Sequence, residues 1–356
     1  MAENMSAPNQ EQEINPWSVE GARDENGEIA SIDYEAISPG KWNTPIIDQK
    51  LLERFEKVTG HKPHRWLRRG LFFSHRDFDR ILNLYERGEP FFLYTGHGPS
   101  TGSLHLGHTI PLQFTKWLQD IFDVTLVFML TEDALGNARD VIAIDIDMKK
   151  AFIYSDLKYF GNHFLMNAWE FSKLVTFNQV RATQIGTNTG RVFFPSVQRV
   201  AAFATSYPEI WSDYPQPTRI DQDPYFRLLW DNAYKVRFPS PKPALIHSKF
   251  LTALQGPGGK MSSSNPNSAI FIGGQVSVVD HRSLGGNPDV DVSYIYLTVA
   301  LLTGELKNMA IDALQEYVQQ FQEEKLATDE ILEEYMRPRK LLWEGNPNPV
   351  AKPSGF

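Results

Sequence analysis

The sequence contains no cysteine among its 356 residues. Disulfides and thiolate metal sites are therefore excluded, which fits a reducing compartment. No apolar run approaches the ~20 residues that cross a membrane. The polar, acidic start also lacks the basic and apolar regions of a signal or transit peptide. We therefore expect a soluble, cytoplasmic protein without membrane association.

The sequence also has fewer basic than acidic residues. It contains 35 Lys and Arg and 43 Asp and Glu residues, which gives a net charge of −8. This balance excludes a general nucleic-acid coat, although local patches still count, since phosphate contact depends on where the cations lie. Two basic clusters stand out, at 61–69 and 337–340. Each is either a solvated charged face or a contact for RNA, and the first could touch an acceptor stem.

The most informative stretch is 90–120. An aromatic run ending in Leu-Tyr-Thr predicts a strand, a glycine-broken turn follows, and an amphipathic helix is expected from about His108. The N-terminus of a helix offers free N–H groups and a positive dipole end, which favour an anion. His105 and His108 frame this site around Gly107, and Pro111 is predicted in the first helical turn. The pattern predicts a nucleotide held by its phosphates, with two imidazoles directed at one phosphorus.

A second glycine-rich stretch, Gln-Gly-Pro-Gly-Gly-Lys-Met-Ser-Ser-Ser, occupies 255–264. We expect a mobile loop whose cation, Lys260, closes over a triphosphate and stabilises the departing pyrophosphate. Between the two stretches lie apolar segments that predict buried strands, at 124–130, 151–155 and 243–247. Strands that alternate with helices predict a parallel sheet, which binds ligands beyond the carboxyl ends of its strands.

Both ends of the chain carry further elements. Apolar spacing predicts helices over 48–59 and 74–87, and a helical C-terminal third over 303–336. Near the start, the Asn-Gly turn within 24–28 predicts a hairpin whose second arm is 29–34.

The two glycine-rich stretches, in this order, resemble the Thr-Gly-x-x-Pro-(Ser/Thr)-Gly-x-Leu-His-x-Gly-His and Lys-Met-Ser-x-Ser signatures of class I aminoacyl-tRNA synthetases. Together with Ile-Asp-Gln-Asp-Pro-Tyr-Phe-Arg at 220–227, they resemble the eukaryotic and archaeal tryptophanyl type. The resemblance implies an α/β fold, a parallel-sheet Rossmann-like catalytic domain followed by a C-terminal α-helical anticodon-binding domain. The implied boundaries are a disordered leader (1–14), an N-terminal cap hairpin (15–47), the catalytic domain (48–275, with leading helices over 48–88), the anticodon-binding domain (276–345) and a tail (346–356).

The resemblance also implies the reaction. Tryptophan and Mg²⁺-bound ATP would give tryptophanyl-adenylate, and the aminoacyl group would then pass to tRNA(Trp), in a homodimeric enzyme. The implied catalytic residues are His105, His108 and Lys260. The implied ATP-binding residues are Gly96, His97, Gly98, His105, Gly107, His108, Lys260, Met261, Ser262 and Ser264. The implied residues around the amino acid are Tyr94, Gly96, Thr131, Gln198 and Gln222, of which Gln222 and Tyr94 would pair with the indole N–H. No residue is assigned to a metal.

The chain departs from the family pattern at several points. His97 replaces an arginine, Met129 replaces a Gln or Glu that meets the amino group, and Thr218-Arg219 replace a small Cys-Ala pair. The sequence is also shorter than the family pattern at the junctions 133/134, 272/273 and 299/300, through deletion or through segments missing from the numbering. Three alternatives therefore stay open: a catalytically impaired homologue that binds a nucleotide or a partner, a small-molecule nucleotidyltransferase, and a tyrosine-specific synthetase.

Overall fold

A computed structural model describes residues 12–14, 19–22, 32–34, 44–97, 104–130, 134–155, 159–181, 188–201, 203–211, 218–221, 242–253 and 256–261. The predicted anticodon-binding domain and the tail lie outside these residues, so the helical C-terminal third stays a prediction. No helix within the described part is long and apolar enough to cross a membrane.

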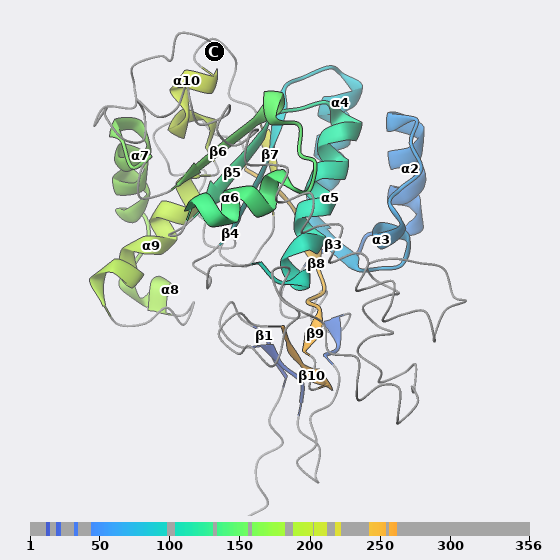
Figure 1. Ribbon diagram of the computed structural model, residues 1–356, viewed down its shortest axis with the longest axis horizontal. Helices are drawn as coiled ribbons and strands as arrows, with labels where there is room; N and C mark the ends of the chain where they lie inside the picture. The colour runs from blue at the N-terminus through green and yellow to red at the C-terminus, as the bar shows by residue number, and fades with distance from the viewer. Residues whose placement is uncertain are drawn as a thin grey trace, which may run out of the picture.

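A six-stranded sheet forms the centre of the described structure, with strand order β3-β8-β7-β4-β5-β6 (Figure 1). Its strands are β3 (Phe72–Arg76), β4 (Phe91–His97), β5 (Leu126–Leu130), β6 (Ala151–Ser155), β7 (Thr218–Asp221) and β8 (Ala244–Ser248). All neighbours pair in parallel except β3, which runs antiparallel to β8. The chain moves outward from β4 to β6 and then returns to the other side of β4. The direction in which the chain adds strands therefore reverses between β4 and β7. Open parallel sheets bind ligands at such a switch point.

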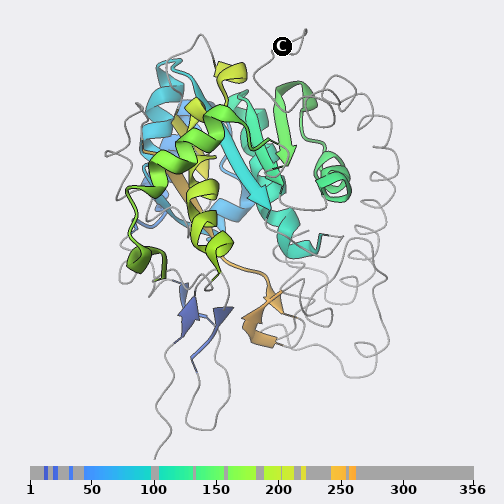
Figure 2. The same cartoon turned by 90° about the vertical axis from the view of Figure 1, so that its left-hand side faces the viewer.

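Helices cover both faces of this sheet, which confirms the Rossmann-like arrangement expected from the sequence. Their bounds are α2 (Gln49–Thr59), α3 (Arg65–Arg68), α4 (Phe78–Glu86), α5 (Leu106–Phe122), α6 (Ala134–Ile142), α7 (Asn162–Ser172), α8 (Phe177–Arg181), α9 (Thr189–Val200) and α10 (Pro208–Trp211), with single 3₁₀ turns η2 (Met148–Lys150) and η3 (Ala204–Ser206). In Figure 1, α4, α5 and α2 lie on one side of the sheet and α7 and α9 on the other; in Figure 2, α7 and α9 lie in front of it.

The side chains of the sheet separate into two cores because successive residues of a strand point to opposite faces. Leu93 and Phe128 belong to one cluster, with Phe114 of α5. Tyr94 and Met129 belong to the other, which also contains residues of α7 and α9. The sheet therefore separates a face covered by α5 from a face covered by α7 and α9.

The predicted strands are confirmed at β5, β6 and β8, and the predicted helix over 48–59 is confirmed at α2. Asp48 caps α2 by accepting a hydrogen bond from the Leu51 N–H (2.9 Å), and Gly60 ends the helix with a φ of +73°. The basic link after α2 is not a simple loop, because it contains the short helix α3.

Two predicted helix starts were wrong. Ser74 does not begin a helix but lies in β3, where its hydroxyl bonds Nδ1 of His247 (2.8 Å), and the helix begins only at Phe78. Helix α5 begins at Leu106, so Pro111 lies in its second turn rather than its first. Because proline has no N–H, Pro111 cannot donate to the carbonyl of Gly107, four residues earlier.

A second, small sheet has the order β1-β2-β10-β9 and lies below the main sheet in Figures 1 and 2. Its strands are β1 (Glu13–Ile14), β2 (Val19–Glu20), β9 (Thr252–Ala253) and β10 (Gly256–Lys260). The side chain of Gln12 bonds the backbone N–H and carbonyl of Asp33 at 2.9 and 3.1 Å, so the chain returns beside its own start.

This small sheet bears on two expectations. Strand β1 is formed by Glu13 and Ile14, at the end of the predicted leader, and pairs with β2, whereas the predicted Asn-Gly turn lies outside the described residues. The first half of the expected mobile loop is strand β10, which pairs with β9 on one side and with β2 on the other. Glycines without Cβ atoms leave the backbone of this segment open to pairing on both edges.

Candidate active site

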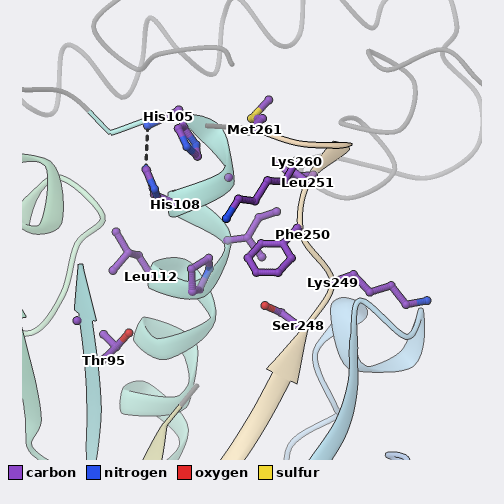
Figure 3. Close-up of a pocket in the computed structure, with 14 residues that line it drawn as sticks. Thr95, His105, His108, Leu112, Ser248, Lys249, Phe250, Leu251, Lys260 and Met261 are labelled. Carbon is purple, nitrogen blue, oxygen red and sulfur yellow. Dashed lines mark hydrogen bonds between the residues drawn. The ribbon is translucent and has the colours of Figure 1, made fainter. Parts of the chain in front are cut away.

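A pocket of about 200 Å³ lies at the carboxyl ends of β4 and β8, against the start of α5 (Figure 3). This is the edge of the sheet at which the topology predicts a ligand. Six of the residues predicted from the sequence line it: Gly96, His105, Gly107, His108, Lys260 and Met261. The two glycine-rich stretches therefore meet at one cavity, although His108 and Lys260 are 152 residues apart in the chain.

The two histidines form a stacked pair at the start of α5. Their ring centroids lie 3.6 Å apart with an angle of 19° between the planes. The backbone N–H of His105 donates a hydrogen bond to Nδ1 of His108 (3.3 Å), so a neutral His108 ring carries its proton on Nε2. His108 therefore presents Nε2 as a hydrogen-bond donor, the chemistry that a phosphate oxygen requires.

Gly107 allows this stack to form. A Cβ atom at this position would lie 2.9 Å from Cε1 and 3.0 Å from Nδ1 of the His105 ring. Real Cβ atoms do not approach other atoms so closely, so any larger residue would displace His105. The sequence predicts that Gly107 admits a ligand, and this role stays a prediction; in the structure, the group that needs the missing Cβ atom is the His105 ring.

Asp140, on α6, fixes the chain just before the histidines. It is fully buried, and its Oδ2 accepts a hydrogen bond from the backbone N–H of Leu104 (3.3 Å). A buried carboxylate that accepts a backbone N–H is a strong restraint on that segment. Asp140 therefore helps to set where His105 enters the pocket.

Lys260 faces the histidines from the opposite wall. Figure 3 shows it beside Phe250 and Leu251, across from α5. Its ammonium lies 5.1 Å from the centroid of the Phe250 ring, and the backbone N–H of Met261 donates to the carbonyl of Leu251 (3.0 Å). Burial lowers the pKa of Lys260 from its usual value. An incoming triphosphate would oppose this effect, because a nearby anion favours the charged form.

The other face of β4 carries Tyr94, one of the residues expected around the amino acid. Tyr94 is buried, and its hydroxyl donates to Sδ of Met129 (3.7 Å), so its lone pairs can still accept a hydrogen bond. Gly96 is close to both regions of the site. It lines the pocket around the histidines, and a Cβ atom at this position would come within 3.3 Å of the Tyr94 hydroxyl. Tyr94 and Gln198 do not line the pocket around the histidines.

Gln198, on α9, carries a buried acceptor without a partner. Its Oε1 is shielded from solvent and makes no hydrogen bond. A buried polar atom of this kind is rare, because leaving it unpaired costs about 1–3 kcal/mol. The arrangement fits a ligand that brings a donor, such as an ammonium or an indole N–H.

Several predicted residues lie outside the described part of the chain: Gly98, Thr131, Gln222, Ser262 and Ser264. Their roles stay predictions, as does the shortening at the three junctions, each of which touches such residues. His97 is the last residue of β4, paired in register with Leu130. Gln222 follows directly in sequence on β7, the strand beside β4 at the point where the sheet reverses.

Sequence reasoning missed three residues of this region. Asp140 lies in α6 between Arg139 and Val141, and nothing in this run signals its buried contact with Leu104. Phe250 precedes Lys260 by ten residues, and Tyr34 accepts a hydrogen bond from the backbone N–H of Phe250 (3.1 Å). No local signal connects Tyr34 with the pocket, because the contact depends on the fold.

No family model matches the chain. The cytoplasmic tryptophan–tRNA ligase of Saccharomyces cerevisiae is 42% identical, over 94% of this chain and 90% of the relative. The alignment has 395 positions, more than the 356 residues of this chain, so the relative carries residues that this chain lacks.

Two solved structures are similar in fold. The tryptophanyl-tRNA synthetase of Plasmodium falciparum superposes with a TM-score of 0.74 at 31% identity, over 88% of this chain and 99% of the other. The enzyme of Giardia lamblia gives 0.71 at 32% identity, over 85% and 95%. The cytoplasmic location expected from the sequence is the one that the curated relatives carry in their names. By identity, coverage and fold, the chain belongs to the tryptophan–tRNA ligase family.

Proposed function

We propose that this chain activates tryptophan with ATP and transfers it to tRNA(Trp). The observation that carries the proposal is the convergence of His105, His108 and Lys260 on one pocket at the carboxyl ends of the strands β4 and β8. Two imidazoles on one wall and a cation on the other can hold a triphosphate between them. Membership of the family supplies the identity of the amino acid.

In the first step, a carboxylate oxygen of tryptophan attacks the α-phosphorus of ATP. The bond from that phosphorus to the oxygen bridging to the β-phosphate breaks, and pyrophosphate leaves. In the second step, a ribose hydroxyl at the 3′ end of the tRNA attacks the acyl carbon, and AMP leaves. The protein's part is to position the reactants and to stabilise developing charge, through His108 Nε2 at the α-phosphate and Lys260 at the pyrophosphate.

Mg²⁺ would enter this site with the nucleotide, where it neutralises phosphate charge. Phosphate oxygens are usual magnesium ligands, and the ion commonly keeps several waters. The described residues contain no group of three His, Asp or Glu side chains arranged to hold a metal. The triphosphate therefore supplies the ligands in this proposal.

Tryptophan would lie on the Tyr94 face of β4 and meet ATP at Gly96. The unpaired Gln198 Oε1 supports this placement, since it offers an acceptor to the amino group or the indole N–H of the substrate. A site that pairs a substrate N–H can reject analogues without it by roughly 10⁴-fold or more. Met129 cannot replace a Gln or Glu at the amino group, because an uncharged thioether sulfur is only a weak acceptor and this one already accepts from Tyr94. Gln198 takes that role in this proposal.

The test is amino-acid-dependent exchange of labelled pyrophosphate into ATP, with tryptophan and tyrosine in parallel. We expect exchange with tryptophan alone, reduced about 100-fold or more when His105 and His108 are both replaced by alanine. Exchange with tyrosine alone would contradict the substrate. No exchange with either amino acid, from folded protein, would favour the impaired homologue. Light scattering of the purified chain tests the homodimer that the resemblance implies.

A further inference from the structure

The N-terminal segment is connected to Lys260 by two consecutive contacts, through Tyr34 and Phe250. The hydroxyl oxygen of Tyr34 accepts a hydrogen bond from the backbone N–H of Phe250 (3.1 Å). The Phe250 ring in turn lies 5.1 Å from the Lys260 ammonium. Tyr34 is therefore two contacts from a group that the proposed reaction uses, although the two are more than 200 residues apart in the chain.

Tyr34 itself is firmly placed. Its side chain is only 8% exposed, and its ring packs edge-on against Phe73 of β3 at 5.6 Å. Burial raises the pKa of its hydroxyl to about 12, so the group stays protonated and neutral at physiological pH. A neutral hydroxyl keeps its lone pairs available, and one of them accepts the Phe250 N–H.

Phe250, in contrast, lies on a connection rather than in a strand. It falls between β8 and β9, its side chain is 41% exposed, and it lines the pocket. In the described structure, the hydrogen bond to Tyr34 fixes its backbone, while its ring faces the cation. A ring face attracts an ammonium by about 0.5–2 kcal/mol, depending on how far the pair is desolvated.

We propose that Tyr34 is a positioning residue for the adenylation step, which holds Phe250 so that its ring keeps Lys260 directed into the nucleotide pocket. The inference rests on the proposed function, because it assigns Lys260 to the triphosphate. It assigns Tyr34 no contact with substrate. Tyr34 acts on Lys260 only by positioning the backbone and ring of Phe250. Substitution of Tyr34 should therefore have no effect on the rate when Lys260 is absent.

A double-mutant cycle tests this dependence. Tyr34→Phe removes one oxygen and keeps the buried ring, and Phe250→Leu keeps apolar volume but removes the ring face. Each is measured alone and together with Lys260→Ala, by tryptophan-dependent pyrophosphate exchange. Tyr85→Phe is the matched control, since it also removes one hydroxyl hydrogen bond, to the carbonyl of Ile121 (3.4 Å), away from the pocket.

With Lys260 present, we expect Tyr34→Phe and Phe250→Leu each to lower kcat/KM for ATP by roughly three- to tenfold, the rate equivalent of such a contact. The KM for tryptophan should stay unchanged. In the Lys260→Ala background, both substitutions should change the rate by less than about twofold. Tyr85→Phe should have no effect in either background.

Equal losses with and without Lys260 would overturn the inference and leave Tyr34 as a packing residue. So would a loss of thermal stability with no change in kcat/KM for ATP. The same cycle on ATP affinity, measured by calorimetry, needs no turnover. If wild-type protein shows no exchange but the calorimetric cycle shows coupling, the proposed reaction fails while the link from Tyr34 to Lys260 stands.

Discussion

At the scale of single residues, Gly107 gives the sharpest prediction. In Gly107→Ala, the new methyl group would overlap the His105 ring, which must then leave its stack with His108. A displacement of this size at a reacting centre costs roughly tenfold to a hundredfold in kcat/KM. The free energy of unfolding should hardly fall, because alanine favours a helix over glycine by about 0.5–1 kcal/mol. Exchange kinetics and urea unfolding measure the two effects.

Gly190→Ala provides the comparison for this substitution. Gly190 lies in α9, and a Cβ there would meet only Asn188 Oδ1 at 3.4 Å, an ordinary contact. Its activity should match wild type. If Gly107→Ala retains full activity with a normal unfolding curve, the stacked geometry of the histidines is not required.

His64 gives a pH prediction. Its Nδ1 accepts the Trp66 N–H (3.2 Å), and the pKa of the imidazole is lowered to about 4 by burial and then by the charges of Arg65 and Arg68. Between pH 6.5 and 4 the unfolded chain therefore binds a proton that the folded chain does not. The stabilising contribution of His64 is complete above pH 6.5 and is lost as the pH falls toward 4.

His64→Asn keeps a capping acceptor but cannot titrate in this range. We expect the free energy of unfolding of wild type to fall more steeply than that of His64→Asn between pH 7 and pH 4.5, measured by urea titration. His61→Asn, an exposed position in the same link, should follow wild type. Parallel pH profiles for wild type and His64→Asn would contradict the assignment.

At the scale of elements, α3 and the residues before it form a basic segment beside the pocket. Lys62, Arg68 and Arg69 are exposed, and Leu71, which follows them, accepts the backbone N–H of Lys249 at the pocket wall (2.8 Å). Exposed cations beside an active site suit a phosphate backbone. We therefore expect this segment to contact the tRNA acceptor stem near its 3′ end.

The variant Lys62→Glu, Arg68→Glu tests that contact. Aminoacylation of tRNA should weaken by about tenfold or more at low salt, and the salt dependence of the reaction should become shallower. Pyrophosphate exchange, which needs no tRNA, should be unchanged. Lys50→Glu, Lys57→Glu changes as much charge on the exposed surface of α2 and should affect neither reaction. Equal loss of exchange and aminoacylation would place the effect in adenylation instead.

The elements show why part of the structure could be predicted. Strands β5 and β6 carry side chains buried on both faces, so their sequences read as continuous apolar runs, and α2 carries its own cap at Asp48. The prediction of a helix start at Ser74 was wrong because a serine before an acid commonly begins a helix. In the structure, its hydroxyl instead bonds His247 on the neighbouring strand. The pairing of β2 with β10 could not be predicted from either segment. A two-residue strand and a glycine-rich run show no alternation of apolar and polar residues.

The candidate site divides in the same way. His105, Gly107 and His108 could be predicted because one continuous turn contains them, and Lys260 because it lies in a second compact motif. Asp140 accepts the backbone N–H of Leu104, and the backbone N–H of Phe250 donates to the Tyr34 hydroxyl. Both contacts join residues far apart in the sequence, so these roles depend on the fold. The unpaired oxygen of Gln198 is visible only once burial is known.

At the scale of the whole molecule, ligands should stabilise the fold by mass action. The pocket draws residues from β4, α5, β8 and β10, so unfolding destroys the site. Saturation with ATP at 100 times its dissociation constant should add about 2.7 kcal/mol to the free energy of unfolding. Calorimetry should show a higher Tm with ATP and a further rise with tryptophan. A Tm unaffected by ATP would contradict the nucleotide site.

The pairing of Glu20 with Gly259 also has a consequence for synthesis of the chain. At the usual 5–20 residues per second, β10 leaves the ribosome roughly 10 to 50 s after β2. During that interval, the nascent protein can already stack its two histidines, but it carries a strand with an open edge and has no lysine opposite them. The site that we propose for the triphosphate is therefore completed late in translation, and a chain released before residue 260 would lack its cation.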